Sequence, residues 1–355
     1  MAISLASETP VSIPSHDFNI MLDFARTVFS LKDNQTYLDL LEAYLPDTAK
    51  IKTQWPSVLM GFDYHLTPDG PKLIEINNNA GGLYVGDNRW LPQPAIAELP
   101  GSLEQRLTEM FHADWATIAI MDEDVTNQYM YPEMLAYASH LERDSRHVVV
   151  VSPEDLQLSG DGLYFDGRKI DAIYNRHTDF YLEGADLTHV RTAYELGQVV
   201  VNPHPRSYAL IGDKSRMVDW WREGLLEQCI EIDAIDRIRA VTPQTLQFAE
   251  VDLDKVWTDR KKWVFKPAAR HGGKGVVLGK GMSRKRFESL DSGETIIQQL
   301  VPASQVEVEG QNMKLDIRLY MHGEKLIALA GRVWRGQVTN FREPGSGWVA
   351  LSIEG

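Results

Sequence analysis

Residues 72–82, KLIEINNNAGG, combine an aliphatic strand pattern with side chains that can bind a cation. Side chains alternate along a strand, so Glu75 and Asn77 are expected on one face. The Pro-Asp-Gly sequence at 68–70 predicts a hairpin turn, and the register counted back from it places Asp63 opposite Glu75. Two facing carboxylates repel unless a cation lies between them, and oxygen ligands suit Mg²⁺ or Mn²⁺. We therefore predict a metal site formed by Asp63, Glu75 and Asn77.

Two alternatives compete with this metal site. Either carboxylate could face water on a half-exposed sheet, and a register slip of one residue would turn Asp63 to the other face. Pro71 also removes a ladder donor close to the turn. The aliphatic neighbours Phe62, Leu73 and Ile76 favour the functional interpretation, because they leave the acidic residues as exceptions in an apolar pattern.

A second polar segment, WVFKPAARHGGKGVVLG at 263–279, supplies cations that an anionic ligand requires. Lys266 lies inside an apolar strand pattern, and Lys274 lies in the glycine-rich loop that follows it. Glycines let backbone N–H groups approach phosphate oxygens, and lysines neutralise phosphate charge. The segment is not a Walker A loop, because its spacing differs and a strand follows it. A Gly-Gly-Lys turn is also compatible with a plain hairpin.

Further polar residues occur near the end of the chain. Arg318 and Arg332 lie on consecutive predicted strands, where arginines usually face solvent, and Asn340 lies in the following loop. The predicted strand at 296–302 ends in backbone that could hydrogen-bond a purine or could simply leave the sheet edge.

Bulk composition limits the classes of function. The chain has 355 residues, 43% of them hydrophobic, and a formal net charge of -14, which argues against broad binding to nucleic acid or anionic membranes. Cys229 is the only cysteine, which excludes an intramolecular disulfide framework. The N-terminus lacks a signal-peptide pattern, and no apolar run is long enough to span a bilayer. We therefore expect a cytoplasmic α/β protein.

Periodicity predicts the order of elements along the chain. A strand, a helix and two further strands between 117 and 176 indicate a βαβ unit with a parallel sheet. A Rossmann dehydrogenase is not expected, because no glycine fingerprint follows the first of these strands. The predicted elements are helices at 15–45, 101–113, 131–144 and 213–230, a hairpin at 58–77, and strands at 117–121, 147–152, 169–176, 261–268, 275–279, 295–301, 314–323 and 325–335.

In their joint order, these motifs resemble the ATP-grasp family. The matching residues in the second half of the chain are Asp213-Lys214, Thr242-Pro243, Lys266, Gly272 to Gly275, Gln298 to Val301, Asp316 with Arg318, Arg332 and Asn340. The family's last two motifs, an aspartate strand and an ExN strand, occur instead at the front, as Asp63 and Glu75-Ile76-Asn77. The sequence therefore resembles a circularly permuted ATP-grasp protein, as in eukaryotic glutathione synthetase and glutathionylspermidine synthetase-like proteins.

The resemblance implies an α/β (α+β) ATP-grasp fold, circularly permuted, with a Rossmann-like pre-ATP-grasp substrate lobe. Residues 1–112 would complete the ATP-grasp core with the metal-binding strands. Residues 113–212 would form the substrate lobe, and residues 213–355 the nucleotide-binding lobe with a Gly-rich flap. The implied reaction joins a carboxylate to an amine through an acyl phosphate, with ATP and Mg²⁺ (or Mn²⁺).

The resemblance also implies a role for each candidate residue. Those implied for the nucleotide are Lys214, Lys266, Gly272, Gly273, Lys274, Gly275, Gln298, Gln299, Leu300, Val301 and Asn340. Those implied for catalysis are Arg318, Arg332 and Lys274, and those for substrate are Asn79, Gly81, Gly82 and Arg176, the last of which could instead pair with Asp179 or Glu183.

The resemblance does not name the substrates. Gly61 stands where eukaryotic glutathione synthetases carry an arginine that meets a substrate carboxylate, and the amidase domain of the glutathionylspermidine group is absent. The expected partners are a small-molecule carboxylate and an amine, without nucleic acid or membrane, and a homodimer is compatible with the sequence. A small-molecule kinase and a non-catalytic nucleotide-binding module are the alternative functions.

Overall fold

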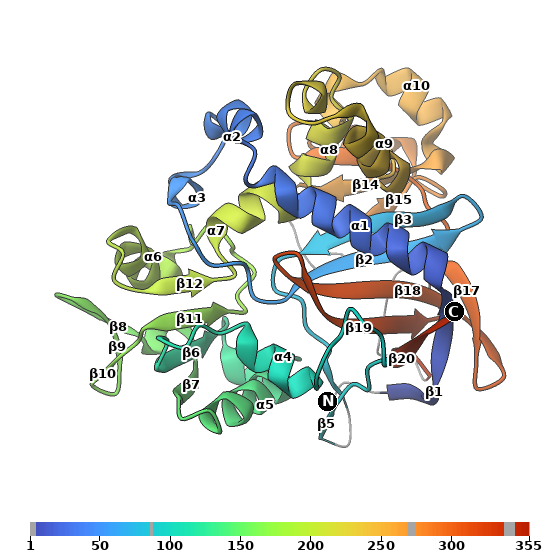
Figure 1. Cartoon of the computed structure of the whole chain (residues 1–355). Helices are drawn as coiled ribbons and strands as arrows, with labels where there is room; N and C mark the ends of the chain where they lie inside the picture. Colours follow the sequence, from blue (N-terminus) through green and yellow to red (C-terminus); the bar gives the residue numbers. More distant parts are fainter. Residues whose placement is uncertain (1–4, 86–87, 269–274, 337–344, 355) are drawn as a thin grey trace.

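A computed structural model describes residues 5–85, 88–268, 275–336 and 345–354 (Figure 1). The chain folds as a mixed α/β protein around a seven-stranded sheet, which confirms the predicted fold class. The strand order is β1-β20-β19-β18-β2-β3, and β17 pairs with β18 outside this path. The strands are β1 (Leu5–Pro14), β2 (Met60–Thr67), β3 (Gly70–Asn77), β17 (Ser304–Val308), β18 (Gln311–His322), β19 (Lys325–Trp334) and β20 (Gly347–Glu354).

Strands from both ends of the described chain lie side by side in this sheet. β1 pairs with β20 in parallel, and β2 pairs with β18 antiparallel. The predicted hairpin at 58–77 is β2 and β3, so its polar residues enter a sheet built otherwise from the last third of the chain.

Alternation along β18 gives the sheet two different faces. Its apolar side chains pack in the largest core together with helix α1 (Ser15–Leu31), which crosses that face of the sheet (Figure 1). The intervening positions, among them Asp316 and Arg318, turn to the opposite face. The core residues from β18 are Met313, Leu315, Ile317, Leu319 and Met321.

A second sheet, with order β12-β11-β6-β7, is parallel throughout. This confirms the βαβ prediction for this part of the chain. The chain leaves β6 toward β7 on one side and later returns as β11 on the other, so the carboxyl ends of β6 and β11 form a topological switch point. The elements are β6 (Thr117–Met121), α5 (Tyr131–Glu142), β7 (His147–Val151), β11 (Ala172–Asn175), α6 (Thr188–Glu195) and β12 (Val200–Asn202).

A third, four-stranded sheet has the order β13-β16-β14-β15 and its own small core of Phe248, Val256, Phe265, Phe287 and Ile297, with Met282. The predicted strands at 261–268, 275–279 and 295–301 are all present, and each is shorter than predicted. The elements are α8 (Ser215–Trp221), α9 (Ile232–Val241), β13 (Thr245–Gln247), α10 (Leu253–Thr258), β14 (Trp263–Pro267), β15 (Val277–Leu278), α11 (Arg284–Glu288) and β16 (Thr295–Gln299).

Some elements differ from the sequence prediction. β1, β17 and β20 were not predicted; β1 contains Pro10 and Pro14, which weaken a strand pattern but are tolerated at a sheet edge. The helix predicted at 213–230 ends at Trp221, where Arg222 turns to an extended conformation, and Gly224 follows with a positive φ of 79°. The remaining elements are α2 (Gln35–Glu42), α3 (Asp47–Lys50), β4 (Tyr84–Val85), β5 (Arg89–Trp90), α4 (Leu103–Glu109), β8 (Gln157–Ser159), β9 (Gly162–Phe165), β10 (Arg168–Lys169) and α7 (Pro205–Ser207).

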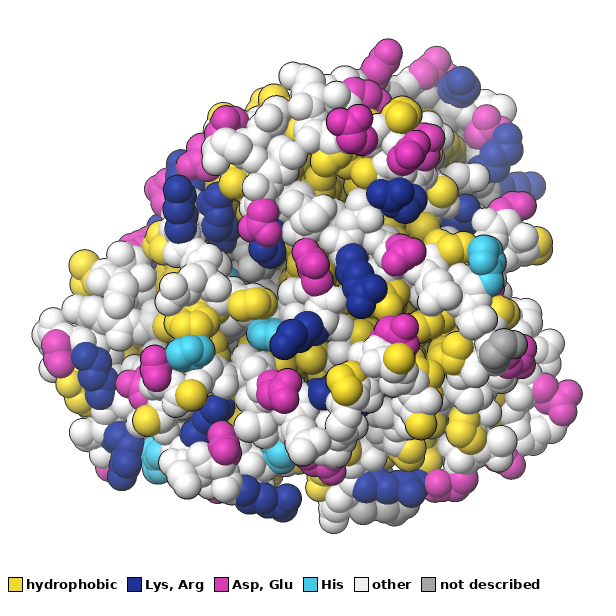
Figure 2. Space-filling model, in the orientation of Figure 1, with side chains coloured by type: hydrophobic (Ala, Val, Ile, Leu, Met, Phe, Trp, Pro, Cys, Tyr) yellow, Lys and Arg dark blue, Asp and Glu magenta, His cyan; other side chains and the backbone are white. Residues whose placement is uncertain are grey.

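Acidic and basic side chains are interspersed over the face drawn in Figure 2, so the excess negative charge is spread out on this side of the molecule. None of the helices within the described ranges is both long and apolar enough to cross a membrane.

Candidate active site

The β2–β3 hairpin places Asp63 directly opposite Glu75, as predicted, although the route to this pairing differs. At the turn Thr67 pairs with Gly70, one position away from the predicted register. A β-bulge between Asp63 and Tyr64 adds one residue on β3 and so restores the predicted pairing beyond it. Asn77 lies on the same face and its amide donates to Asp63 at 3.0 Å.

The extra residue of the bulge is Ile74, and its carbonyl oxygen accepts a hydrogen bond of 2.9 Å from Lys266 Nζ. A bulged residue is left unpaired in its own ladder, so this oxygen is available to a group outside the sheet. The bulge therefore joins the third sheet to the acidic hairpin. Lys266 and Glu75 lie close together, although 191 positions separate them in the sequence, 266 minus 75.

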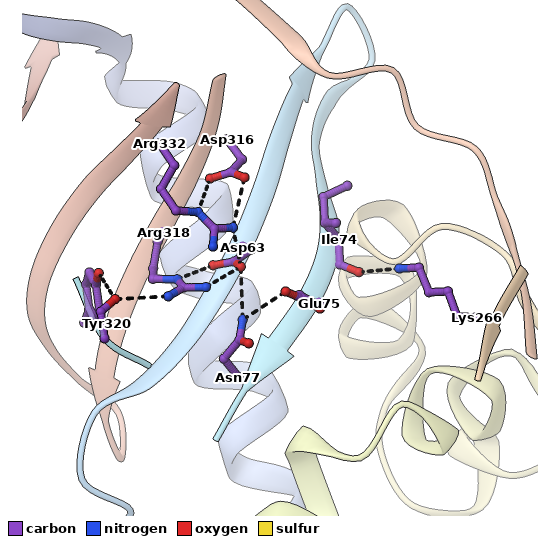
Figure 3. A network of polar contacts seen from close by, with 10 residues as sticks. Asp63, Ile74, Glu75, Asn77, Lys266, Asp316, Arg318, Tyr320 and Arg332 are labelled. Atoms are coloured by element: carbon purple, nitrogen blue, oxygen red, sulfur yellow. Dashed lines mark hydrogen bonds and ion pairs between the residues drawn. The ribbon is translucent and has the colours of Figure 1, made fainter. Parts of the chain in front are cut away.

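Asp63 is the centre of a buried ion-pair network (Figure 3). Nε and Nη2 of Arg318 each lie 2.6 Å from one of its carboxylate oxygens. Nη2 of Arg332 lies 2.6 Å from Asp63 Oδ2, and the same guanidinium holds Asp316 at 2.6 and 2.9 Å. Cross-strand pairing explains the arrangement, because Arg318 faces Asp63 and Arg332 faces Asp316 in adjacent strands.

The two carboxyl groups of this network differ in pKa. Burial raises the pKa of Asp63, but Arg318 and Arg332 more than offset it, so the net shift is downward. For Asp316, burial dominates over Arg332 and the negative charge of Asp63 adds to it, which raises the pKa to about 6. Asp63 therefore stays ionised to a lower pH than Asp316 does.

These ion pairs bear on the predicted metal set. In the described ranges, no group of three or more His, Cys, Asp or Glu side chains is arranged to hold a metal. The cations facing Asp63 are two guanidinium groups, an arrangement that the sequence interpretation did not include. Glu75 and Asn77 are only half-buried and share the hydrogen bond from Asn77 Nδ2 to Glu75 Oε1 at 3.4 Å. Asp63 is thus engaged by two arginines, and the metal set of Asp63, Glu75 and Asn77 stays a prediction.

Lys266 is buried at the edge of this site. Its Nζ also donates to Gln298 Oε1 at 2.7 Å. Burial lowers the pKa of Lys266 to about 8, while Glu75 opposes the shift and the nearby Lys214 adds to it. Burial likewise lowers the pKa of Lys214, again against the effect of Glu75. Glu75 thus acts on two buried ammonium groups, and Asp213 acts on Lys214 as well.

The predicted purine segment, Gln298 to Val301, has several partners within the protein. The Gln298 side chain holds Lys266, and the Leu300 N–H donates to the Lys262 carbonyl at 2.7 Å. His65 Nδ1 lies 3.3 Å from the Val301 carbonyl oxygen, while Gln299 is exposed. Gly275 is exposed with a φ of 85°. The predicted residues Gly272, Gly273, Lys274 and Asn340 lie outside the described residues.

The four residues predicted to meet substrate lie together at the switch point of the parallel sheet. Asn79 Nδ2 donates to the Arg176 carbonyl at 2.6 Å, and Arg176 Nη1 donates back to the Asn79 carbonyl at 2.8 Å. The Gly81 carbonyl accepts from Arg318, and Gly82 packs against Trp348. Arg176 thus pairs with this loop rather than with Asp179 or Glu183.

Gly61 has a structural reason to be glycine. A Cβ atom there would lie 2.6 Å from Ala80 Cβ and 3.2 Å from the Arg318 side chain. Arg318 therefore occupies the space beside Gly61, and a larger residue at this position would displace it.

Sequence reasoning missed several residues of this region. Glu133, Tyr320 and Trp348 were not singled out, and Asp316 was noted only as part of a motif. Glu133 carried a usable signal, since it shares the inner stripe of α5 with Tyr137 and Leu141. The roles of Tyr320 and Trp348 depend on strand pairing, which one sequence does not reveal.

Comparison with known proteins identifies structures with a similar fold. No protein-family model matches the chain, and no curated protein matches its sequence. A glutathione synthetase-like effector from Globodera pallida, solved in its apo form, is 12% identical with a TM-score of 0.61, over 94% of this chain and 88% of that chain. A candidate gamma-glutamylcysteine synthetase from Methylobacillus flagellatus KT is 14% identical with a TM-score of 0.52, over 91% and 85%. These likenesses confirm the predicted glutathione synthetase-like fold.

Proposed function

We propose that the protein is an ATP-dependent carboxylate–amine ligase, which forms an amide through an acyl phosphate and releases ADP and phosphate. One observation carries the proposal. Acids from the N-terminal hairpin, arginines from β18 and β19, and the buried Lys266 gather at one face of a sheet whose fold is shared with a glutathione synthetase-like protein. Ligation requires cationic side chains beside the acids, because a substrate carboxylate must approach a triphosphate and both are negatively charged.

The buried lysines support nucleotide binding. Burial disfavours the charged forms of Lys266 and Lys214, and the negative charge of a polyphosphate beside them would favour those forms. In the proposal, Lys266 binds the α- and β-phosphates while Lys214 neutralises charge nearby. Gly272, Gly273 and Lys274 would cover the β- and γ-phosphates, and Asn340 would lie beside them, as the family resemblance implies.

The half-buried oxygens of the hairpin fit Mg²⁺. Glu75 Oε and Asn77 Oδ1 are hard ligands on one face of β3, and Asp63 fixes Asn77 from the neighbouring strand. When held by Glu75 and Asn77, Mg²⁺ would withdraw charge from the transferring phosphoryl group. Mg²⁺ commonly keeps several waters and takes few protein ligands, which agrees with a site of only two side chains.

The arginine pair would serve the reacting groups. In the first step a substrate carboxylate oxygen bonds to the γ-phosphorus while the bond to the β-phosphate oxygen breaks, which releases ADP. In the second step the amine bonds to the acyl carbon, phosphate leaves, and the amine loses a proton. Arg332, the more exposed of the pair, offers a guanidinium fork to the oxygens that gain charge, while Asp63 and Asp316 hold it in place.

We also propose that the chain is a circularly permuted ATP-grasp protein. The acidic hairpin from residues 60–77 occupies the sheet position next to β18, among strands from the last third of the chain, which supports this proposal. The three-lobe division at 112 and 212 remains a prediction.

Release of ADP under a screen of amino acids, short peptides and polyamines tests the proposed reaction. A ligase releases ADP only when both a carboxylate and an amine are present, and hydroxylamine traps its acyl phosphate as a hydroxamate. A kinase releases ADP with one acceptor and forms no hydroxamate. A nucleotide-binding module binds ATP without turnover, and either of these last outcomes overturns the proposal.

The Glu75→Gln variant tests the metal ligand directly. We expect turnover to fall by at least about 100-fold, because the carboxylate would position charge on the transferring phosphoryl group. The fold should remain intact, since Glu75 is half-buried and is not part of the arginine network. Wild-type turnover with Mg²⁺ in this variant would show that the assignment is wrong.

A further inference from the structure

The Asn79–Tyr84 loop connects the active-site face to the parallel sheet. On the first side, the Gly81 carbonyl accepts hydrogen bonds from Arg318 Nη1 at 3.2 Å and from Tyr320 Oη at 2.8 Å. The same arginine holds Asp63 (Figure 3). The position of the Gly81 carbonyl is therefore linked to the position of the guanidinium group.

On the second side, one buried carboxylate holds the loop. Glu133, near the start of α5, is only 1% exposed, and its Oε2 accepts three backbone hydrogen bonds from Gly82, Leu83 and Tyr84, at 2.8, 2.9 and 3.1 Å. Burial raises the pKa of Glu133, while Arg176 and these N–H groups oppose the shift. A carboxylate with three donors on one oxygen fixes a loop more firmly than separate neutral contacts would.

Arg176 fixes the other half of the loop. Its Nη1 donates to the carbonyls of Asn79 and Ala80, at 2.8 and 3.0 Å, and its Nη2 lies 3.9 Å from Glu133 Oε1. Glu133 and Arg176 are thus buried, carry opposite charges and together hydrogen-bond both halves of the loop.

Side chains of neighbouring elements pack closely around Gly81. A Cβ atom on Gly81 would lie 2.4 Å from Met130 Cε, 2.6 Å from Arg176 Nη2 and 2.8 Å from Glu133 Oε1. The Glu133 carboxylate is thus connected through the loop backbone and the Gly81 carbonyl to Arg318.

We propose that Glu133 is a positioning residue, which sets the place of Arg318 in the active site by holding the Asn79–Tyr84 loop. This inference deepens the proposed ligase function and rests on it for the catalytic consequence. Glu133 does not touch the reacting groups. Its effect passes through the loop backbone and the Gly81 carbonyl.

Two variants and one matched control test the role of Glu133 in the full chain. E133Q keeps the shape and one acceptor oxygen, E133A removes both, and E142A makes the same truncation at an exposed position of the same helix. Three quantities are measured: hydrogen exchange at the amides of residues 82–84, affinity for Mg·ADP, and kcat and KM for ADP release.

In E133A, we expect exchange at residues 82–84 to accelerate at least about tenfold, because three hydrogen bonds of these amides are lost. The kcat should fall by about 100-fold, the cost of a catalytic group displaced by about 1 Å. Mg·ADP affinity and the KM for ATP should stay unchanged, because Lys266 lies outside the loop. E133Q should show a smaller increase in exchange and a smaller loss of kcat than E133A, and E142A should match the wild type.

Unchanged exchange in both Glu133 variants would overturn the inference, and so would faster exchange with wild-type kcat. If E133A does not fold, E133Q is compared with E142A in its place. If the wild type releases no ADP with any substrate pair, the ligase proposal fails, whereas exchange at residues 82–84 still decides whether Glu133 holds the loop.

Discussion

At the scale of single residues, Asp63 shows how one charge can decide whether others can be buried. Two guanidinium groups are at most 12% exposed at their side chains, and both bind this carboxylate. Arg318 also lies over the rings of Tyr320 and Trp348, at 5.8 and 5.7 Å. Removing charge from an ion that is buried and paired leaves its partners uncompensated.

The Asp63→Asn variant should therefore lose stability as well as function. We expect the free energy of unfolding to fall by about 3–5 kcal/mol, because Arg318 and Arg332 would share only Asp316. Urea unfolding measures the change. The control is Asp161→Asn, which removes an exposed carboxylate paired with Lys169. Equal stability losses in the two variants would contradict a central role for Asp63.

His204 predicts how the stability depends on pH. Burial and Arg206 lower its pKa to about 3, and its Nδ1 accepts the Arg206 backbone N–H at 3.1 Å, which a protonated ring could not do. The unfolded chain takes up this proton near pH 6.5 and the folded chain does not. The contribution of His204 is thus complete above pH 6.5 and is lost as the pH falls toward 3.

Urea unfolding between pH 7 and 4 checks this sign. We expect stability to decrease on acidification by up to about 1.4 kcal/mol per pH unit from this group. H204N should reduce that slope, whereas H16N, at an exposed position, supplies the matched control. The same slope in H204N and the wild type would contradict the prediction.

At the scale of elements, the β2–β3 hairpin and the loop after it perform different tasks. The bulge at Ile74 turns a carbonyl toward Lys266, and the tight loop brings backbone against Trp348. Gly70 and Gly82 both have positive φ, 87° and 106°, yet their surroundings differ. A Cβ on Gly70 would meet nothing within 4 Å, whereas one on Gly82 would lie 2.0 Å from the Trp348 ring.

Alanine variants at Gly70 and Gly82 separate the effect of backbone strain on stability from the effect of a steric clash. We expect Gly70→Ala to lower the free energy of unfolding by about 1–2 kcal/mol, from the left-handed conformation alone. Gly82→Ala should lower the free energy of unfolding by about 1–3 kcal/mol more than Gly70→Ala does, because the Trp348 ring must also move. Thermal or urea unfolding measures both, and similar losses would show that the loop tolerates a side chain beside Trp348.

At the scale of the whole molecule, the candidate active site combines residues from three parts of the fold. The largest sheet supplies the ion-pair network, the third sheet supplies Lys266, and the region of the parallel sheet supplies Arg176, after β11, and Glu133, on α5. A ligand bound among them should therefore stabilise the entire chain.

Mg·ADP is expected to raise the free energy of unfolding by about 2.7 kcal/mol at 100 times its Kd, and EDTA should reduce the gain.

Lys266→Ala should weaken nucleotide affinity at least about tenfold, since a charged hydrogen bond donor is lost. Titration calorimetry measures the affinity. Lys280→Ala, at an exposed site in the same part of the chain, is the control. Equal affinities in the two variants would count against Lys266.

Much of the fold followed from local patterns. Helix α1, the β2–β3 hairpin and the βαβ unit were predicted because apolar periodicity and turn residues act over short distances. The strands β1 and β20 were missed, since they are stabilised by pairing with strands distant in the sequence or predicted separately, β1 with β20 and β20 with β19. In the site, Asp63 opposite Glu75 was predicted, but only because the bulge at Ile74 compensated a register error at the turn.

The sequence by itself determined which chemistry the chain carries: a few acids, lysines and arginines placed against apolar strand patterns, in an order that resembles the ATP-grasp family. Only the tertiary structure decided which of these groups meet. The arginines bind Asp63, and Glu133 holds the loop beside them. Both arrangements depend on contacts between distant segments. Such contacts are set by strand pairing and burial across the whole molecule, which no local pattern records.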